Sequence, residues 1–131
     1  MRFNPLWAVL PLLLSLTQQV KAEERWLKIA DNSNSTIFLD TKYLSIEKGF
    51  ASAQAIEKLN TVASDGTVQE LTKYRFLCKR RLGTIQSVIK IGADNKIIDY
   101  IVNQEPNKLT KVVEKTVAGA VFNYACANSN S

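Results

Sequence analysis

The sequence predicts an α+β domain, in which an antiparallel β-sheet meander of about five to six strands is followed by a C-terminal α-helix tied to the sheet by a disulfide. Alternating side chains and short turns fill residues 26 to 102, and apolar residues recur four apart after residue 116. Period-two alternation is typical of strands, whereas a spacing of four is typical of one helix face. The chain has two cysteines, Cys78 and Cys126.

Residues 1–22 are predicted to be a signal peptide. A basic residue, Arg2, precedes an apolar run from residue 6 to 16, and Val20-Lys21-Ala22 ends the segment, which matches a secretory signal with a small-residue cleavage site. The alternative is an uncleaved N-terminal anchor, although the run is about half of the ~20 residues that a spanning helix needs. Residues 23–131 are then expected to form a single exported domain, periplasmic, secreted or associated with the cell surface, with no transmembrane segment.

The first strands are expected at residues 26–29 and 36–40. Residues 50–59 leave two alternatives open, because their alanine content favours a helix whereas alanines at 51, 53 and 55 favour a strand. Ser64-Asp65-Gly66-Thr67 predicts a hairpin turn. Two β-branched stretches, residues 85–91 and 97–102, predict further strands separated by a turn at 93–96. Such short turns predict antiparallel pairing.

The strand expected over residues 72–82 has two different faces. One parity is expected to face the core and comprises Thr72, Tyr74, Phe76 and Cys78. The other parity is expected to face water and is the candidate binding site, a basic stripe of Lys73, Arg75, Lys79 and Arg81. An electropositive stripe suits acidic partners. The alternative is a solvated face that guards an edge against aggregation. Gly83 is expected to end this strand.

The last element is predicted to be a helix. The Thr116 hydroxyl can accept a hydrogen bond from the first turn, and Ala118, Phe122 and Cys126 share one helix face. Residues 109–114 form either a turn or a short strand before it. Since Cys78 and Cys126 both lie on core-facing positions of an exported chain, we expect them to form a disulfide. The alternative is two free thiols.

The residue types that the sequence lacks exclude several activities. The chain has no histidine, which rules out Ser-His-Asp and Cys-His nucleophile systems and ordinary zinc sites. It also has no glycine-rich phosphate loop. Loss of Arg2 and Lys21 with the signal lowers the formal net charge from +5 to +3, which is too mild to indicate nucleic-acid binding. We therefore expect no enzyme, no catalytic residues, no metal and no cofactor.

Four segments, in order, resemble the bacterial surface-adhesin protein E family. They are Trp26-Leu-Lys-Ile-Ala30, Thr36-Ile-Phe-Leu-Asp40-Thr41, Cys78-Lys79-Arg80-Arg81 and Thr116-Val-Ala-Gly-Ala-Val-Phe-Asn-Tyr-Ala-Cys126. The resemblance implies a small exported domain with an antiparallel sheet and a disulfide-linked C-terminal helix. It also implies a virulence-related role in adhesion, through binding of host proteins such as vitronectin and laminin. Some members are lipoproteins, and this chain lacks the cysteine for such an anchor.

Two functions remain open on this basis. The first is a non-enzymatic binding protein, a surface adhesin whose partners are host extracellular-matrix or serum proteins or sulfated glycans. The second is a periplasmic structural or inhibitory protein that docks one envelope partner. The oligomeric state is open, and a dimer is one of the alternatives.

Overall fold

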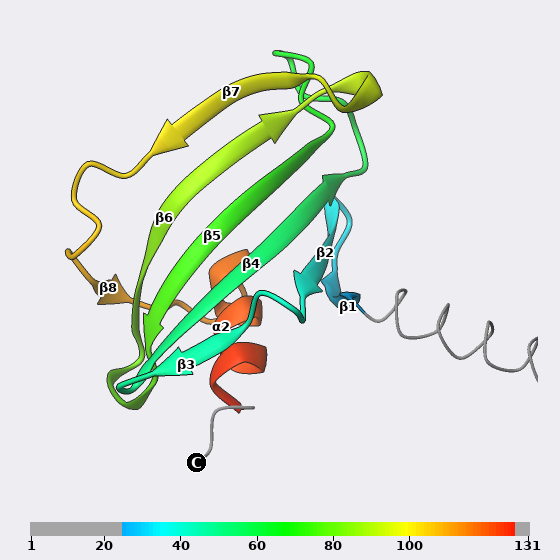
Figure 1. Cartoon of the computed structure of the whole chain (residues 1–131). Coiled ribbons are helices and arrows are strands. Elements are labelled where there is room, and N and C mark those ends of the chain that lie inside the picture. Colours follow the sequence, from blue (N-terminus) through cyan, green and yellow to red (C-terminus); the bar gives the residue numbers. More distant parts are fainter. Residues whose placement is uncertain (1–24, 128–131) are drawn as a thin grey trace, which may run out of the picture.

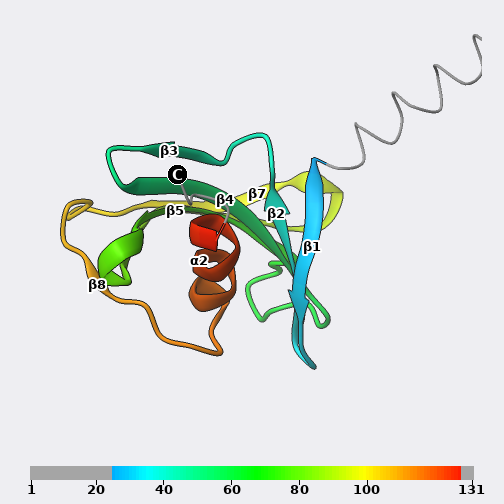
Figure 2. The same ribbon diagram turned by 90° about the horizontal axis from the view of Figure 1, so that it is seen from below.

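The computed structural model describes residues 25–127. The expected signal peptide lies outside the described residues. Eight strands form one antiparallel sheet in this part of the chain, and helix α2 (Val117–Ala127) packs against one of its faces (Figures 1 and 2). The strands are β1 (Trp26–Asp31), β2 (Ser35–Asp40), β3 (Ser45–Glu47), β4 (Phe50–Leu59), β5 (Gln69–Leu77), β6 (Leu82–Ile91), β7 (Ile97–Val102) and β8 (Thr110–Lys111). Two short 3₁₀ turns are η1 (Cys78–Arg80) and η2 (Ala93–Asn95).

The predicted α+β class and the antiparallel meander are confirmed. The main path through the sheet runs β1-β2-β4-β5-β6-β7. The short strand β3, which sequence analysis missed, pairs with the start of β4, and β8 pairs with the start of β6. The open alternative at residues 109–114 is therefore resolved as a two-residue strand followed by a turn.

The ambiguous residues 50–59 form β4, which pairs with β2, β3 and β5. Ala51, Ala53 and Ala55 are almost completely buried on the face that α2 covers. Small side chains at these positions let the helix backbone approach the sheet closely. The alternation of alanines therefore reflects packing beneath a helix, and the alternative of a helix at 50–59 is wrong.

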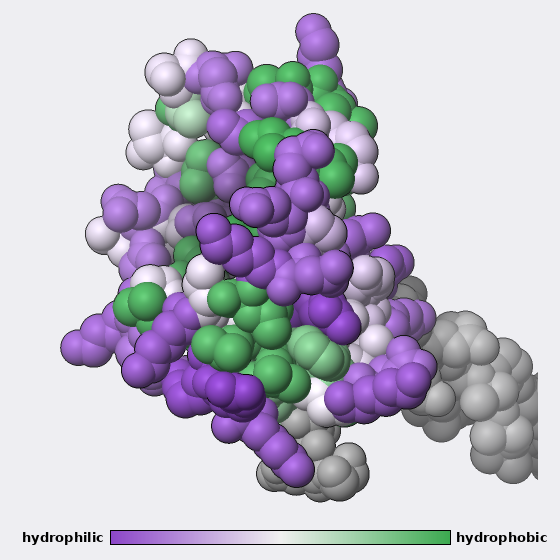
Figure 3. Space-filling model, turned by 90° about the vertical axis from the view of Figure 1, so that its left-hand side faces the viewer, coloured by the Kyte–Doolittle hydropathy of each residue, from purple (hydrophilic) through white to green (hydrophobic). Residues whose placement is uncertain are grey.

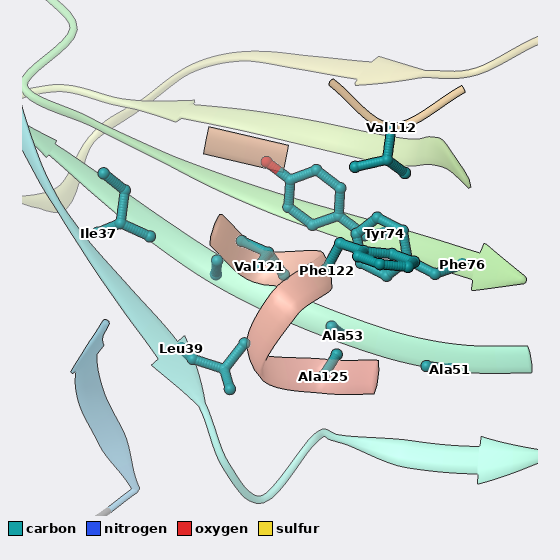
Figure 4. Packing of buried hydrophobic residues seen from close by; sticks show 11 residues of the cluster. Ile37, Leu39, Ala51, Ala53, Tyr74, Phe76, Val112, Val121, Phe122 and Ala125 are labelled. Atoms are coloured by element: carbon teal, nitrogen blue, oxygen red, sulfur yellow. The ribbon is translucent and has the colours of Figure 1, made fainter. Parts of the chain in front are cut away.

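Helix α2 begins as the sequence predicts. The Gly119 N–H donates to the Thr116 hydroxyl oxygen at 3.0 Å, which caps the first turn. Val121 and Phe122 are buried, and the Phe122 ring meets the Phe76 ring edge-on, with centroids 5.4 Å apart. Figure 4 shows these side chains gathered between α2 and the sheet, with Tyr74 next to Phe76. This aromatic cluster is the centre of the core.

The predicted disulfide between Cys78 and Cys126 is also present, with the two Cα atoms 5.5 Å apart. Cys78 is not on a strand as expected, because β5 ends at Leu77 and Cys78 begins η1. The bond therefore joins the turn of the β5–β6 hairpin to the last turn of α2.

Candidate functional site

Strand β5 presents two different faces, as its alternation predicts. Thr72, Tyr74 and Phe76 are buried beneath α2. Lys73 and Arg75 have the opposite parity and are half-buried. We call the face that α2 covers the helix-side face and the opposite one the outer face.

The basic stripe does not continue along one strand face, which corrects the sequence-based expectation. Leu77 pairs with Leu82, so the four residues between them must reverse the chain. Lys79 lies within the 3₁₀ turn, and Arg81 follows it with a left-handed backbone (φ 52°). Turn geometry, rather than strand alternation, thus sets the direction of these two side chains.

Arg81 is directed to the helix side of the molecule. Its guanidinium carbon lies 4.7 Å from the centre of the Phe122 ring, and its Nη2 atom pairs with a Glu114 carboxylate oxygen at 3.1 Å. Lys79 is exposed within the turn. Of the four predicted binding residues, Lys73 and Arg75 are therefore the two that lie on the outer face of β5.

The outer face carries a row of apolar side chains across five strands. Strand register places Phe38 opposite Ile56, Ile56 opposite Leu71, Leu71 opposite Ile89, and Ile89 opposite Tyr100. Directly opposed residues on one face of an antiparallel pair contact each other. We call this set the outer row. Tyr100 is 61% exposed, and the other four are half-buried.

Cationic side chains pack on aromatic rings of the same face. Lys58 Nζ lies 5.1 Å from the centre of the Phe38 ring, and Lys73 Nζ lies 5.4 Å from the Tyr43 ring. The Arg75 guanidinium carbon is 3.7 Å from the Phe50 ring centre. Such contacts are attractive because the ring face carries partial negative charge. They hold three positive charges, those of Lys58, Lys73 and Arg75, against the outer face.

Lys58 was not among the predicted site residues. It lies two residues after Ile56 in β4, so it shares the outer parity. Strand alternation would have identified it if residues 50–59 had been assigned as a strand from sequence.

Acidic side chains of the central strands belong to the helix-side face. Glu57 and Glu70 lie opposite each other there, and the Ser35 hydroxyl donates to a Glu57 carboxylate oxygen at 2.7 Å. Burial raises the pKa of the nearby Tyr74 hydroxyl to about 12, and the charge of Glu57 adds to the effect. Tyr74 therefore stays neutral at physiological pH. Because Glu57 and Glu70 lie on the helix-side face, they do not neutralise the positive charge on the outer face.

One outer-face carboxylate, Asp40, is engaged in a structural cluster. Arg25 donates to both of its oxygens, at 3.2 and 3.1 Å, and Gln54 Nε2 donates to it at 3.2 Å. Burial alone would raise the pKa of Asp40, but the hydrogen bonds from Arg25 and the Lys42 N–H, together with the charge of Arg25, hold the pKa below its usual value. The cluster fastens the start of β1 to the end of β2.

The described residues contain no group of three histidine, cysteine, aspartate or glutamate side chains arranged to hold a metal ion. Between residues 25 and 127, no helix is long and apolar enough to cross a membrane.

The fold is similar to that of a solved bacterial protein, Haemophilus influenzae protein E. The two structures superpose with a TM-score of 0.59 over 82% of this chain and 91% of the other, at 9% sequence identity. No protein-family model matches the chain, and no curated protein matches its sequence. The likeness therefore establishes a shared fold.

Proposed function

We propose that the chain is an exported, non-enzymatic binding domain that recognises an acidic macromolecular surface through its outer face. One observation carries the proposal: the outer row of apolar side chains is flanked by three cations, and α2 covers only the opposite face. The occupant is a macromolecule rather than a small molecule, because the surface spans the sheet from Phe38 to Tyr100.

The composition of this face suits protein recognition. In an antiparallel sheet with one solvated face, the solvated side chains are usually polar. Here, five large apolar residues share that face, Tyr100 exposed and the other four half-buried, and apolar surface left open to solvent is typical of interaction sites. Aromatic residues and arginine are also enriched at protein interfaces. Lys58, Lys73 and Arg75 would attract and orient a partner with complementary negative charge.

The finer proposal is adhesion. Its support is the sequence resemblance to the surface-adhesin protein E family, which implies vitronectin and laminin as partners. Sulfated glycans are further candidate partners, because their negative charge matches the positive charge of Lys73 and Arg75. The shared fold agrees with that resemblance. Lys79 and Arg81 contribute less in this proposal, because the β5–β6 turn separates them from the outer row.

The test compares two variants that lose the same charge. The outer-face variant is Lys58→Ser/Lys73→Ser/Arg75→Ser. The control variant is Lys79→Ser/Arg80→Ser/Lys96→Ser, whose side chains are exposed away from the outer row. Binding to immobilised vitronectin, laminin and heparin is measured at low and physiological salt, after circular dichroism has established that both variants fold.

The outer-face variant should bind about tenfold more weakly at low salt, since exposed ion pairs contribute roughly 0.5 kcal/mol each. The control variant should lose less than about twofold, because only Lys79 of its three residues is assigned a minor contribution. The difference should shrink at physiological salt, where exposed charges are screened over about 8 Å. Equal losses in both variants would mean that net charge alone drives binding.

Docking to an envelope protein is the second candidate, and the apolar outer row is the observation that favours it. If the parent binds none of the three host ligands and resists protease added to intact cells, adhesion is wrong and this candidate takes its place. Replacing Leu71 and Ile89 with serine should then abolish cross-linking of the protein to its envelope partner.

A further inference from the structure

A cleft of about 570 Å³ opens on the helix-side face, well away from the outer row. It lies between β6, the start of α2 and the segment of residues 103–116, which arches away from the sheet after β7 and returns as β8 (Figure 1). Figure 3 views the molecule from the side that carries β7 and β8, and it shows apolar groups exposed among hydrophilic ones there.

Specific hydrogen bonds hold this arch in place at both ends. Asn103 Nδ2 donates to the Ile85 carbonyl oxygen at 2.7 Å and to the Thr84 hydroxyl at 3.0 Å. At the other end, the Val112 N–H donates to the Arg81 carbonyl oxygen at 2.9 Å. Between these anchors, β8 pairs with Leu82 and Gly83 of β6, and Gln86 Nε2 donates to the Pro106 carbonyl oxygen at 3.3 Å. Ile85 of β6 lines the cleft beneath the arch. These hydrogen bonds place the arch beside β6 and so define the cleft.

The interior of the cleft is apolar. Tyr74 and Phe76 form its floor, with their rings stacked at a centroid distance of 5.5 Å. Its walls consist of Ile85, Val112, Val113 and Ala118. Ile85 is 42% exposed and Val113 is 61% exposed, although both are large apolar residues. Figure 4 shows Val112 on the same side of the sheet as the two rings.

The rim of the cleft is cationic. Lys108 and Lys111 both line it, and the four ion pairs of the described residues involve neither of them. Glu105 is the acidic residue of the lining. An apolar interior beneath two unpaired ammonium groups complements a ligand with an apolar body and an anionic head.

We propose that this cleft binds a single-chain fatty carboxylate. The alkyl chain would lie against the exposed side chains of Ile85 and Val113, and the carboxylate would pair with Lys108 and Lys111. The site goes beyond the proposed function, because it lies on the face opposite the outer row. Its volume falls within the range of about 300–1,000 Å³ that is common for small-molecule sites.

The geometry favours a single detached chain over a bilayer surface. The exposed apolar residues of the cleft, Ile85 and Val113, come from two different segments, β6 and the arch. One extended chain can lie between these two segments, whereas a flat membrane would contact only their outer edges.

The first test is a titration of the exported protein with laurate, followed by amide chemical shifts. Two comparison ligands are used: dodecyltrimethylammonium reverses the charge of the head group, and butyrate shortens the alkyl chain. Laurate should shift the amides of residues 83–85 and 110–113 and leave those of Lys58 and Leu71 in place. Dodecyltrimethylammonium and butyrate should each bind at least about tenfold more weakly than laurate, since their contacts lack either the charge pairing or most of the buried chain.

The second test uses variants. Lys108→Ser/Lys111→Ser should weaken laurate binding about two- to tenfold, as expected for loss of two exposed charge pairs. Lys79→Ser/Lys96→Ser is the matched control and should leave it unchanged. Ile85→Asp should weaken laurate binding further. If that variant fails to fold, the amide chemical-shift changes of the parent protein still show where laurate binds.

Three outcomes would overturn the proposal. They are no saturable laurate binding below the micelle concentration, equal affinity for laurate and dodecyltrimethylammonium, or shifts centred on the outer face. Binding to phosphatidylglycerol vesicles without binding to monomeric laurate would also overturn it, in favour of a membrane surface. None of these outcomes bears on vitronectin, laminin or heparin binding through the outer face.

Discussion

Removal of the disulfide should destabilise the domain strongly and unevenly. The perturbation is the double substitution Cys78→Ser/Cys126→Ser. The bond closes a loop with a sequence separation of 48 residues, and the chain-entropy model gives about 4 kcal/mol for a loop of that length. A small domain has a total free energy of unfolding of about 5–15 kcal/mol, so the loss would be a large share of it.

The loss should be concentrated in α2. This helix has 11 residues, and helices this short are marginal in water without tertiary contacts. Its packing onto β4 and β5 through Val121 and Phe122 remains in the variant, but nothing covalent then holds its last turn near the β5–β6 turn. The strands keep their ladder, because Cys78 lies outside β5.

Urea unfolding and native-state hydrogen exchange measure the two parts of this prediction. The midpoint should fall with little change in slope, and amides of α2 should lose protection at lower urea than those of β5. Reduced wild-type protein is the control for the serine substitutions themselves. A loss below about 1 kcal/mol, or an equal loss of protection in α2 and β5, would refute the reasoning.

Three further predictions concern single positions. Gly83→Ala should destabilise the domain by about 1–3 kcal/mol in urea unfolding, because its Cβ would lie 2.5 Å from Cδ1 of Phe76. In the Gly83→Ala background, Phe76→Leu should lower the free energy of unfolding by less than it does in the wild type. Asp40→Asn should cost about 1–3 kcal/mol at neutral pH. Because the folded pKa of Asp40 is lowered, that contribution exists above the unfolded pKa near 4 and disappears as pH falls through the folded pKa; a difference in stability that stays constant down to pH 2 would contradict this. Intact mass of the exported protein should correspond to a chain that begins at Glu23, and a mass that retains residues 1–22 would exclude cleavage there.

The parts of the fold that depend on local periodicity could be predicted from the sequence. Alternation of Thr72, Tyr74 and Phe76 identified the buried face of β5, and spacing in residues 117–126 identified the helix and its cysteine. Residues 50–59 stayed ambiguous, because alanine is a helix former and its burial beneath α2 depends on contacts distant in sequence. Only pairing with β2 and β5 resolves that ambiguity.

The turn after β5 was missed because no residue marks it. Left-handed backbone usually requires glycine or asparagine, but Arg81 occupies that position with φ 52°. The nearby Gly83 suggested a strand end, whereas it lies inside β6, where any side chain would collide with Phe76. Lys79 and Arg81 were consequently extrapolated onto a strand that had already ended.

The outer row shows why the candidate site itself could not be read from the sequence. Its members come from five strands, and their alignment depends on register across four strand pairs. Within its own strand, no local sequence pattern distinguishes any of them from its neighbours.

Net charge conceals the property on which the proposed function depends. The formal charge of +3 that is expected after removal of the predicted signal is mild, yet Glu57 and Glu70 face the helix side while Lys58, Lys73 and Arg75 face outward. Exposed charges act over about 8 Å at physiological salt, so a partner at the outer face senses the local cations more than the carboxylates beyond the sheet. Binding should therefore follow the placement of charge rather than its total, which is why two variants of identical net charge are the decisive comparison.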